Sequence, residues 1–195
     1  CIQARIWQKS VAGGQRMTLT VNIATQQFQD DGLLAAVRKA LDVSGLPPSS
    51  LVLEVTETTM LLDTDKTLKT IDKLRSLGVR LAIDDFGTGY SSLSYLQRFA
   101  IDVLKIDKSF IDNIAHEDES SAVARAIISM GQSLRMKTIA EGIESLDQQT
   151  ELQSLGCEYG QGYFFAKPLA KRDMDEYLRT HAAAGALIPP VAIPI

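Results

Sequence analysis

The chain has 195 residues, of which 45% are hydrophobic and 23% are charged, and its formal net charge is −4. This composition is typical of one soluble globular domain with enough residues to bury a sizeable core. Proteins that bind duplex nucleic acid or a membrane surface usually carry a basic patch, so this mildly acidic chain is expected to bind neither.

Cysteine usage and hydropathy indicate the compartment. Cys1 and Cys157 are the only cysteines, which is too few for a disulfide framework and is typical of a reducing compartment. No apolar run reaches the roughly 18 residues of a membrane span, and there is no signal peptide. We therefore expect a cytoplasmic domain, an expectation that leaves room for a membrane anchor elsewhere in the parent protein.

The first residues predict that the chain begins inside a domain. It opens on Cys1, and Ile2, Ile6 and Trp7 have the spacing of the last turns of an amphipathic helix that no capping residue precedes. We expect residues 1–182 to form one domain that lacks its N-terminal strands; an ordinary boundary with a frayed end is the alternative. The Ala- and Pro-rich residues 183–195 are expected to form a loosely ordered tail.

Strand and helix patterns alternate along the rest of the chain. Apolar and β-branched runs predict strands at residues 17–23, 51–55, 79–83, 103–106, 137–140 and 162–165. Apolar residues at helical spacing predict a helix capped by Asp30 and Asp31 and stopped at 44–45, and further helices at 63–77, 92–99, 120–134, 146–155 and 171–181.

Repeated strand–helix units predict an α/β fold with a parallel sheet. Near-continuous apolar strands such as 51–55 suit strands that are covered on both faces. An open doubly wound sheet and a closed (β/α)8 barrel both fit this pattern. The chain has about six units in 195 residues, whereas a barrel has eight units in about 250 residues. We therefore expect a (β/α)8 TIM-like barrel that is incomplete.

Polar residues stand at the end of each predicted strand. A single one is usually a helix cap or a solvated loop residue, but the carboxyl ends of barrel strands converge on one mouth, where catalytic residues belong. The residues at these positions are Asn22, Glu54, Asp84 with Asp85, Lys105, Glu141, and Gln161 at the entry to the sixth strand.

The carboxylates among these residues need cations or protons if they meet. Two carboxylates about 4 Å apart repel by roughly 4 kcal/mol at an effective dielectric constant of 20. Oxygen ligands select Mg²⁺, Mn²⁺ or Ca²⁺ over zinc. The two histidines, His116 and His181, stand in loop or terminal positions and do not suit a zinc site.

The segment DDFGTGYSSL, residues 84–93, is the most specific part of the sequence. Adjacent aspartates at a strand end point their side chains in different directions, so one of the two can bridge two ions while its neighbour holds only the second. Gly87 and Gly89 permit positive φ angles in the loop that follows. A simple glycine-rich turn is the alternative interpretation.

Together with its neighbours, this segment resembles the EAL-domain family of cyclic di-GMP phosphodiesterases. LEVTET precedes it, and LKIDKSFI, TIAEGIES and GYFFAKPL follow it in the order and spacing of that family. TVNIATQQF is similar to the N-terminal Asn motif of the family. The resemblance runs from near residue 15 to near residue 180.

The resemblance implies hydrolysis of cyclic di-GMP to linear pGpG with two ions of Mg²⁺ or Mn²⁺. One ion would be held by Asn22, Glu54 and Asp84. The second would be held by Asp84, Asp85 and, directly or through water, Glu141.

Three further residues have catalytic roles by the same resemblance, alongside Glu141. Lys105 would contact the attacking water, Gln161 would help to place it, and Glu57 would steady the loop that follows Asp85. The resemblance also implies a homodimer and flanking sensory or GGDEF-type domains.

The sequence departs from the family in one respect. The Glu-Ala-Leu signature is absent, and its glutamate is a metal ligand in the family, so the chain alone is expected to bind its first ion poorly and to be inactive. Three rival functions are a cyclic di-GMP receptor without activity, a partner-docking domain, and an enolase-type metal enzyme.

Overall fold

The structure is a computed structural model that describes residues 1–10, 17–62, 64–89, 96, 98–115 and 119–183. Six parallel strands form one sheet in which each strand pairs with the next along the chain. The strands are β1 (Leu19–Asn22), β2 (Leu51–Thr56), β3 (Arg80–Phe86), β4 (Val103–Ile106), β5 (Lys137–Ala140) and β6 (Tyr159–Gly160).

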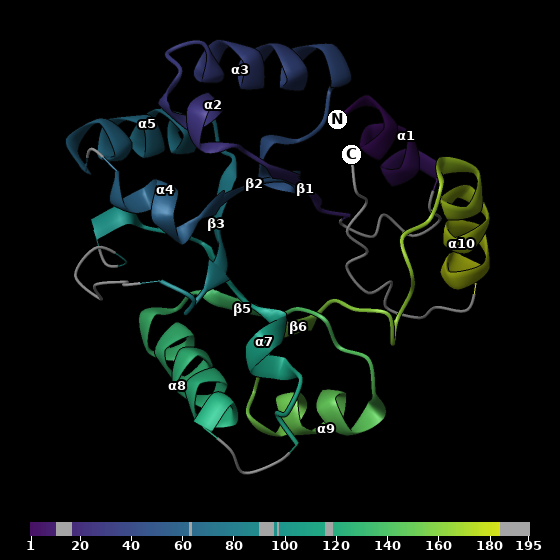
Figure 1. Ribbon diagram of the computed structural model, residues 1–195. Coiled ribbons are helices and arrows are strands. Elements are labelled where there is room, and N and C mark those ends of the chain that lie inside the picture. Colours follow the sequence, from purple (N-terminus) through teal and green to yellow (C-terminus); the bar gives the residue numbers. More distant parts are fainter. Residues whose placement is uncertain (11–16, 63, 90–95, 97, 116–118, 184–195) are drawn as a thin grey trace.

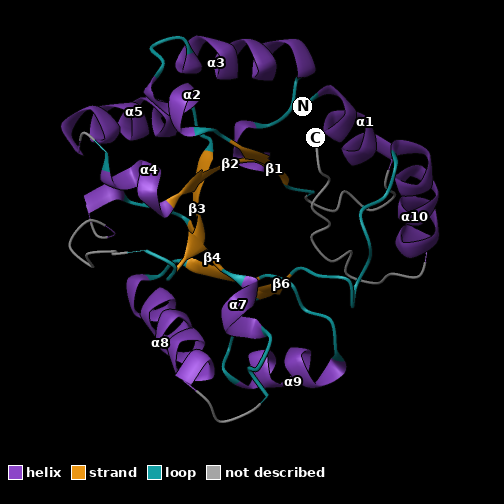
Figure 2. Ribbon diagram, in the orientation of Figure 1, coloured by secondary structure: helices purple, strands orange, loops and turns teal. Residues whose placement is uncertain are grey.

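The helices surround this sheet from outside (Figures 1 and 2). They are α1 (Ile2–Ser10), α2 (Thr25–Gln29), α3 (Leu33–Ser44), α4 (Glu57–Leu61), α5 (Thr64–Ser76), α7 (Lys108–Ile111), α8 (Glu119–Leu134), α9 (Leu146–Ser154) and α10 (Lys171–Ala183), with a 3-10 turn η1 at Pro48–Ser50. Among the described residues, no helix combines the length and the apolar character needed to cross a membrane.

The strand order confirms the predicted α/β fold and decides between the two architectures. A doubly wound sheet reverses its strand order at a switch point, whereas here the order runs β1 to β6 without reversal. The sheet curls around a central space, with the helices on its convex side (Figure 2). The described chain is a curled half-barrel of six strands, as the count of strand–helix units predicted.

Alternation along the strands separates two apolar layers. Leu53, Leu81 and Leu104 face the helices and belong to the main core, while Val52, Ala82 and Val103 form a separate cluster with the partly buried Ile139. Successive strand residues point to opposite faces of a sheet. The second cluster therefore lies on the concave face, inside the half-barrel.

The two ends of the described chain meet outside the sheet. Trp7 of α1 forms a small core with Met174 and Leu178 of α10, and its indole N–H donates to an Asp175 carboxylate oxygen at 2.5 Å. The predicted N-terminal helix is thus confirmed, and it packs beside the last helix (Figure 1).

The sixth strand differs from the prediction. The structure places β6 at Tyr159–Gly160, whereas the aromatic run at 162–165 forms a turn in which the Phe165 N–H donates to the Gly162 carbonyl at 3.1 Å. Apolar and aromatic composition alone made this turn look like a strand. As a consequence, Gln161 follows the strand instead of entering it.

Smaller differences concern helix ends. Asp30 does not cap α3: its carboxylate accepts the Gly32 N–H at 2.7 Å, and the helix begins one residue later. The short helices α2, α4 and α7 were not predicted. The other predicted helices match α5, α8, α9 and α10 within a few residues. Most of the predicted helix at 92–99, and all but the first residue of the tail at 183–195, lie outside the described residues.

Gly162 is a position where a single methyl group is expected to disrupt this region. A Cβ there would lie within 3.0 Å of the Ile143 backbone N, C and O. We expect Gly162→Ala to lower the free energy of unfolding by about 3 kcal/mol, through overpacking and lost hydrogen bonds. Urea denaturation measures this change.

Gly45→Ala is the matched control for this substitution. Gly45 has φ +62°, and no atom lies within 4 Å of the position that a Cβ would take there, so only backbone strain of about 1 kcal/mol is expected. Equal losses in the two variants would contradict the proposed clash with Ile143.

Candidate active site at the mouth of the half-barrel

A charged layer lies directly above the apolar layer inside the half-barrel. Two positions after each residue of the inner apolar cluster, the chain carries a charged residue; these residues are Glu54, Asp84, Lys105 and Glu141. Because the side-chain repeat of a strand is two residues, they extend on the same side, nearer the carboxyl ends. A TIM barrel carries its active site at this end.

Lys105 is the centre of this layer. Its ammonium lies 2.5 Å from a Glu141 oxygen, 2.7 Å from an Asp84 oxygen and 2.9 Å from a Glu54 oxygen. The lysine is only 5% exposed. Because β2, β3 and β5 each supply one of these carboxylates, either directly or just beyond the strand end, the lysine joins groups that are distant in the sequence.

Burial and neighbouring charges leave the pKa values of Lys105, Glu54 and Glu141 above their usual values. Burial alone would lower the pKa of Lys105, but the Coulomb attraction of Glu141, Glu54 and Asp84 raises it above its usual value. Burial raises the pKa of Glu54 to about 7, against the attraction of Lys105. Burial also raises the pKa of Glu141, and nearby Asp84 and Asp85 add to the effect.

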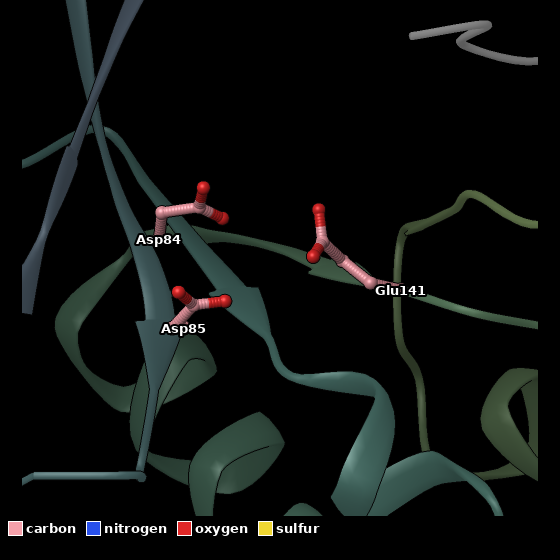
Figure 3. Close-up of side chains that lie close together, drawn as sticks. All are labelled: Asp84, Asp85 and Glu141. Atoms are coloured by element: carbon pink, nitrogen blue, oxygen red, sulfur yellow. The ribbon is translucent and has the colours of Figure 1, made fainter. Parts of the chain in front are cut away.

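Asp84, Asp85 and Glu141 form a carboxylate cluster. One oxygen of each lies within 4.8 Å of the other two, and in Figure 3 the two aspartates of β3 extend toward Glu141. Asp85 adopts a positive φ of 52°, which turns its side chain away from the direction that regular alternation would give it. Burial and the neighbouring Asp84 raise the pKa of Asp85.

This donor set fits hard divalent cations. Three carboxylates contact the Lys105 ammonium and a fourth, that of Asp85, lies beside two of them, so three negative charges remain when all are ionised. Each close pair repels by roughly 3–4 kcal/mol at an effective dielectric constant of 20. The four carboxylates offer oxygen atoms, which Mg²⁺, Mn²⁺ and Ca²⁺ prefer as ligands.

The remaining predicted residues lie around this centre. Asn22 is exposed at the end of β1, in register with Glu54. Gln161 directly follows β6, and its N–H donates to the Ala140 carbonyl at 2.8 Å. These two residues flank the charged layer on its outer strands.

Glu57 lies apart from the cluster. It is 4% exposed at the start of α4, and its carboxylate accepts the Gly87 N–H at 3.2 Å. It therefore contacts the loop that follows Asp85 and Phe86.

The sequence prediction missed Asp107 as a member of this site. It caps α7 by accepting the Ser109 N–H at 3.0 Å, and its charge helps to raise the pKa of Asp85 after burial and Asp84. Its spacing of two residues from Lys105 is the signal that could have identified it.

Comparisons with known proteins agree with this architecture. The EAL domain family profile matches residues 1–168. The cyclic di-GMP phosphodiesterase NbdA of Pseudomonas aeruginosa is 43% identical over 171 residues, which are 88% of this chain and 22% of NbdA.

Solved structures show the same likeness. A c-di-GMP complex of the phosphodiesterase PaMucR shares 41% identity at a TM-score of 0.84, covering 89% of this chain and 70% of that one. BlrP1 of Klebsiella pneumoniae, in complex with manganese and cyclic di-GMP, shares 31% identity at a TM-score of 0.74, covering 85% of this chain and 42% of that one.

A TIM-barrel-like half-barrel with an oxygen-rich acidic mouth is the class of domain that the fold and the site define. Within that class, this chain belongs to the EAL domain family, and the resemblance seen in the sequence is confirmed. The chain spans about a fifth to a quarter of the length of several curated relatives: 22% of NbdA and 24% of the bifunctional diguanylate cyclase/cyclic di-GMP phosphodiesterase MucR.

Proposed function

We propose that this domain hydrolyses cyclic di-GMP to linear pGpG. The observation that carries the proposal is the convergence of Glu54, Asp84 and Glu141 on the buried Lys105 ammonium. The relatives support it, because NbdA is named a cyclic di-GMP phosphodiesterase and PaMucR was solved with c-di-GMP.

Two divalent ions, Mg²⁺ or Mn²⁺, are part of the proposal. Asn22, Glu54 and Asp84 would hold one ion, and Asp84, Asp85 and Glu141 would hold the other. Such a pair, when bound, lowers the pKa of water and holds a phosphate for in-line displacement. The carboxylate cluster of Asp84, Asp85 and Glu141 supports this assignment.

The other roles belong to the protein's own groups. Because its pKa is raised, Lys105 keeps its charge at neutral pH, where it would orient the attacking water or stabilise charge on the phosphoryl oxygens. Gln161 would help to place the same water. Glu57 would keep the loop after Asp85 in position through its hydrogen bond from the Gly87 N–H.

The domain's context is also proposed. We expect it to act in the cytoplasm as a homodimer within a longer polypeptide that carries sensory or GGDEF-type domains. MucR, a relative named as bifunctional, supports the last point, since this chain spans 24% of it. Light scattering on the purified protein tests the homodimer.

Nucleotide chromatography tests the activity. The full gene product and the 195-residue chain are incubated with cyclic di-GMP in Mg²⁺, in Mn²⁺ and in a chelator. Linear pGpG is expected from the full gene product with metal only. The 195-residue chain is expected to give little product, because the family's Glu-Ala-Leu glutamate is not in it.

The other outcomes point to the rival functions. Nucleotide binding without product, from a folded full gene product, would overturn the hydrolase assignment and indicate a receptor. If no nucleotide bound at any metal concentration, the domain would be a docking module.

A further inference from the structure

The side-chain amide of Gln148 joins two loops of the active-site end. Gln148 lies near the start of α9 and is 8% exposed. Its carbonyl oxygen accepts the N–H groups of Glu144 at 2.7 Å and Ser145 at 3.1 Å. Its amide nitrogen donates to the carbonyls of Ile111 and Asp112, both at 3.3 Å. One buried side chain thus makes four hydrogen bonds to two separate backbone segments.

Both of these segments are connected to active-site residues. The segment at Ile111 and Asp112 ends the short α7, which follows Lys105 and Asp107 along the chain. The segment at Glu144 and Ser145 belongs to the loop between β5 and α9, which begins with Glu141. Gln148 therefore fixes the position of the Glu141 loop relative to the chain that carries Lys105.

A second contact crosses the same gap at the surface. The exposed Lys108 forms an ion pair with Glu144. Its side chain covers Gly142, which has φ +71° and where a Cβ would lie within 3.0 Å of three Lys108 carbon atoms. The ion pair is solvent-exposed and contributes little, so Gln148 is the stronger connection.

The Glu141 loop in turn holds the chain around Gln161. The Ile143 N–H donates to the Gln161 carbonyl at 3.0 Å, and the Ile143 carbonyl accepts the Phe164 N–H at 3.0 Å. The loop that Gln148 anchors is therefore the middle one of three neighbouring segments, which carry Lys105, Glu141 and Gln161.

We propose that Gln148 is a positioning residue that sets the place of the Glu141 carboxylate in the site. Its connection to catalysis rests on the proposed hydrolysis of cyclic di-GMP, and its connection to metal binding rests on the proposed ligand role of Glu141. A hydrophobic side chain of similar size would leave two N–H groups and two carbonyls without their partner, and the loop would relax. Partners that orient a metal-binding group typically change affinity or activity by about 10–100-fold when removed.

The test compares Gln148→Leu with a matched control, Gln132→Leu, in the full gene product. The Gln132 amide nitrogen also donates to two backbone carbonyls, those of Leu155 and Gly156, at 3.1 and 3.3 Å. These carbonyls lie at the other end of α9, away from Glu141. Mn²⁺ affinity is measured by electron paramagnetic resonance, stability by thermal unfolding in chelator, and kcat and KM with cyclic di-GMP.

Gln148→Leu is expected to weaken Mn²⁺ binding about 10-fold and to lower kcat about 10–100-fold. Its KM should stay within about threefold of wild type, because Glu141 acts on the reacting centre rather than on overall nucleotide binding. Gln132→Leu is expected to keep wild-type Mn²⁺ affinity and kcat.

Three results would overturn the proposal. One is a wild-type Mn²⁺ affinity in a folded Gln148→Leu protein, and another is an equal loss of Mn²⁺ affinity in Gln132→Leu. The third is a loss of kcat in Gln148→Leu that is fully explained by a smaller fraction of folded protein. If Gln148→Leu fails to fold, Gln148→Glu decides, because its carboxylate can accept the Glu144 and Ser145 N–H groups but cannot donate to the Ile111 and Asp112 carbonyls. A loss of Mn²⁺ affinity of about 10-fold supports the proposal, and an unchanged affinity overturns it. If wild type makes no pGpG, the proposed function fails, but the Mn²⁺ comparison still decides the role of Gln148.

Discussion

Replacing Lys105 by methionine is expected to lower kcat by about 100-fold or more and to destabilise the metal-free protein by about 3 kcal/mol at pH 8. The buried ammonium contacts Glu54, Asp84 and Glu141 at 2.5–2.9 Å. Without it, three carboxylates in one partly buried place lose their common cation, and the substrate loses a donor. Chelator-treated protein is unfolded in urea, and pGpG formation is followed separately.

The effect of Lys105→Met on stability should depend on pH. Burial raises the pKa of Glu54 from 4.5 to about 7, so the folded state binds more protons than the unfolded state between these values. The contribution of Glu54 to stability is therefore greatest below pH 4.5 and falls as the pH rises through 7. Loss of the lysine raises this carboxyl pKa further, so the destabilisation should be larger at pH 8 than at pH 5.

Lys137→Met serves as the control for Lys105→Met. Lys137 is an exposed lysine at the opposite end of β5, where its ammonium donates to the Tyr159 hydroxyl at 2.7 Å. Its loss should change stability by no more than about 0.5 kcal/mol. A Lys105→Met protein as stable as wild type at pH 8 would show that the three carboxylates do not depend on this cation.

Asp84→Asn is expected to abolish the stabilisation that Mn²⁺ gives and to lower kcat/KM about 1,000-fold, which corresponds to several kcal/mol of transition-state stabilisation. Asp84 belongs to both observed groupings, as Glu141 does, since it contacts Lys105 and also lies in the cluster with Asp85 and Glu141. The substitution keeps the shape of the side chain but removes its charge. Thermal unfolding with and without Mn²⁺ measures the first effect.

The metal-free stability of Asp84→Asn separates loss of a ligand from loss of the fold. Because Lys105 keeps its contacts with Glu54 and Glu141, the chelator-treated variant should stay within about 1 kcal/mol of wild type. Asp147→Asn, in the exposed first turn of α9, is the control and should keep the full Mn²⁺ effect. If Mn²⁺ stabilised Asp84→Asn as much as wild type, Asp84 would not be a ligand.

Strand periodicity made the inner strands and the charged layer predictable from the sequence. A run such as LVLEV carries apolar residues on both faces until Glu54, where a charge appears at a position that points inward. Such a residue is conspicuous because burial of a charge without partners is costly. Asp84, Lys105 and Glu141 were identified, without knowledge of their distances, by their place at the carboxyl ends of the predicted strands.

The connections between loops were not predictable in this way. Gln148 lies inside a predicted helix and Thr59 lies in the short α4, which was not predicted, and solvent exposure is the usual expectation for polar residues of this kind. In the structure Gln148 bridges two loops, and the buried Thr59 hydroxyl contacts the Thr25 hydroxyl at 2.7 Å and the Thr56 hydroxyl at 2.9 Å. The Thr25 hydroxyl and the Ile111 carbonyl are more than 30 residues from Thr59 and Gln148, so a local pattern does not contain them.

The prediction of the sixth strand was wrong for a related reason. Its pairing is set by two backbone partners of β5, with Tyr159 next to Ile139 and Gly160 next to Ala140, and not by a run of apolar residues. The aromatic residues Tyr163 and Phe164 that suggested a strand are exposed in the turn that follows.

The two-residue separation between the apolar and the charged layers also limits how such a sequence can change length over evolution. A deletion of one residue between Val52 and Glu54, or between Val103 and Lys105, would turn the charged side chain outward into the helix-facing core. A deletion in a connecting loop leaves that alternation untouched. Related sequences should therefore gain and lose residues in the loops, while the spacing within β2 to β5 stays fixed.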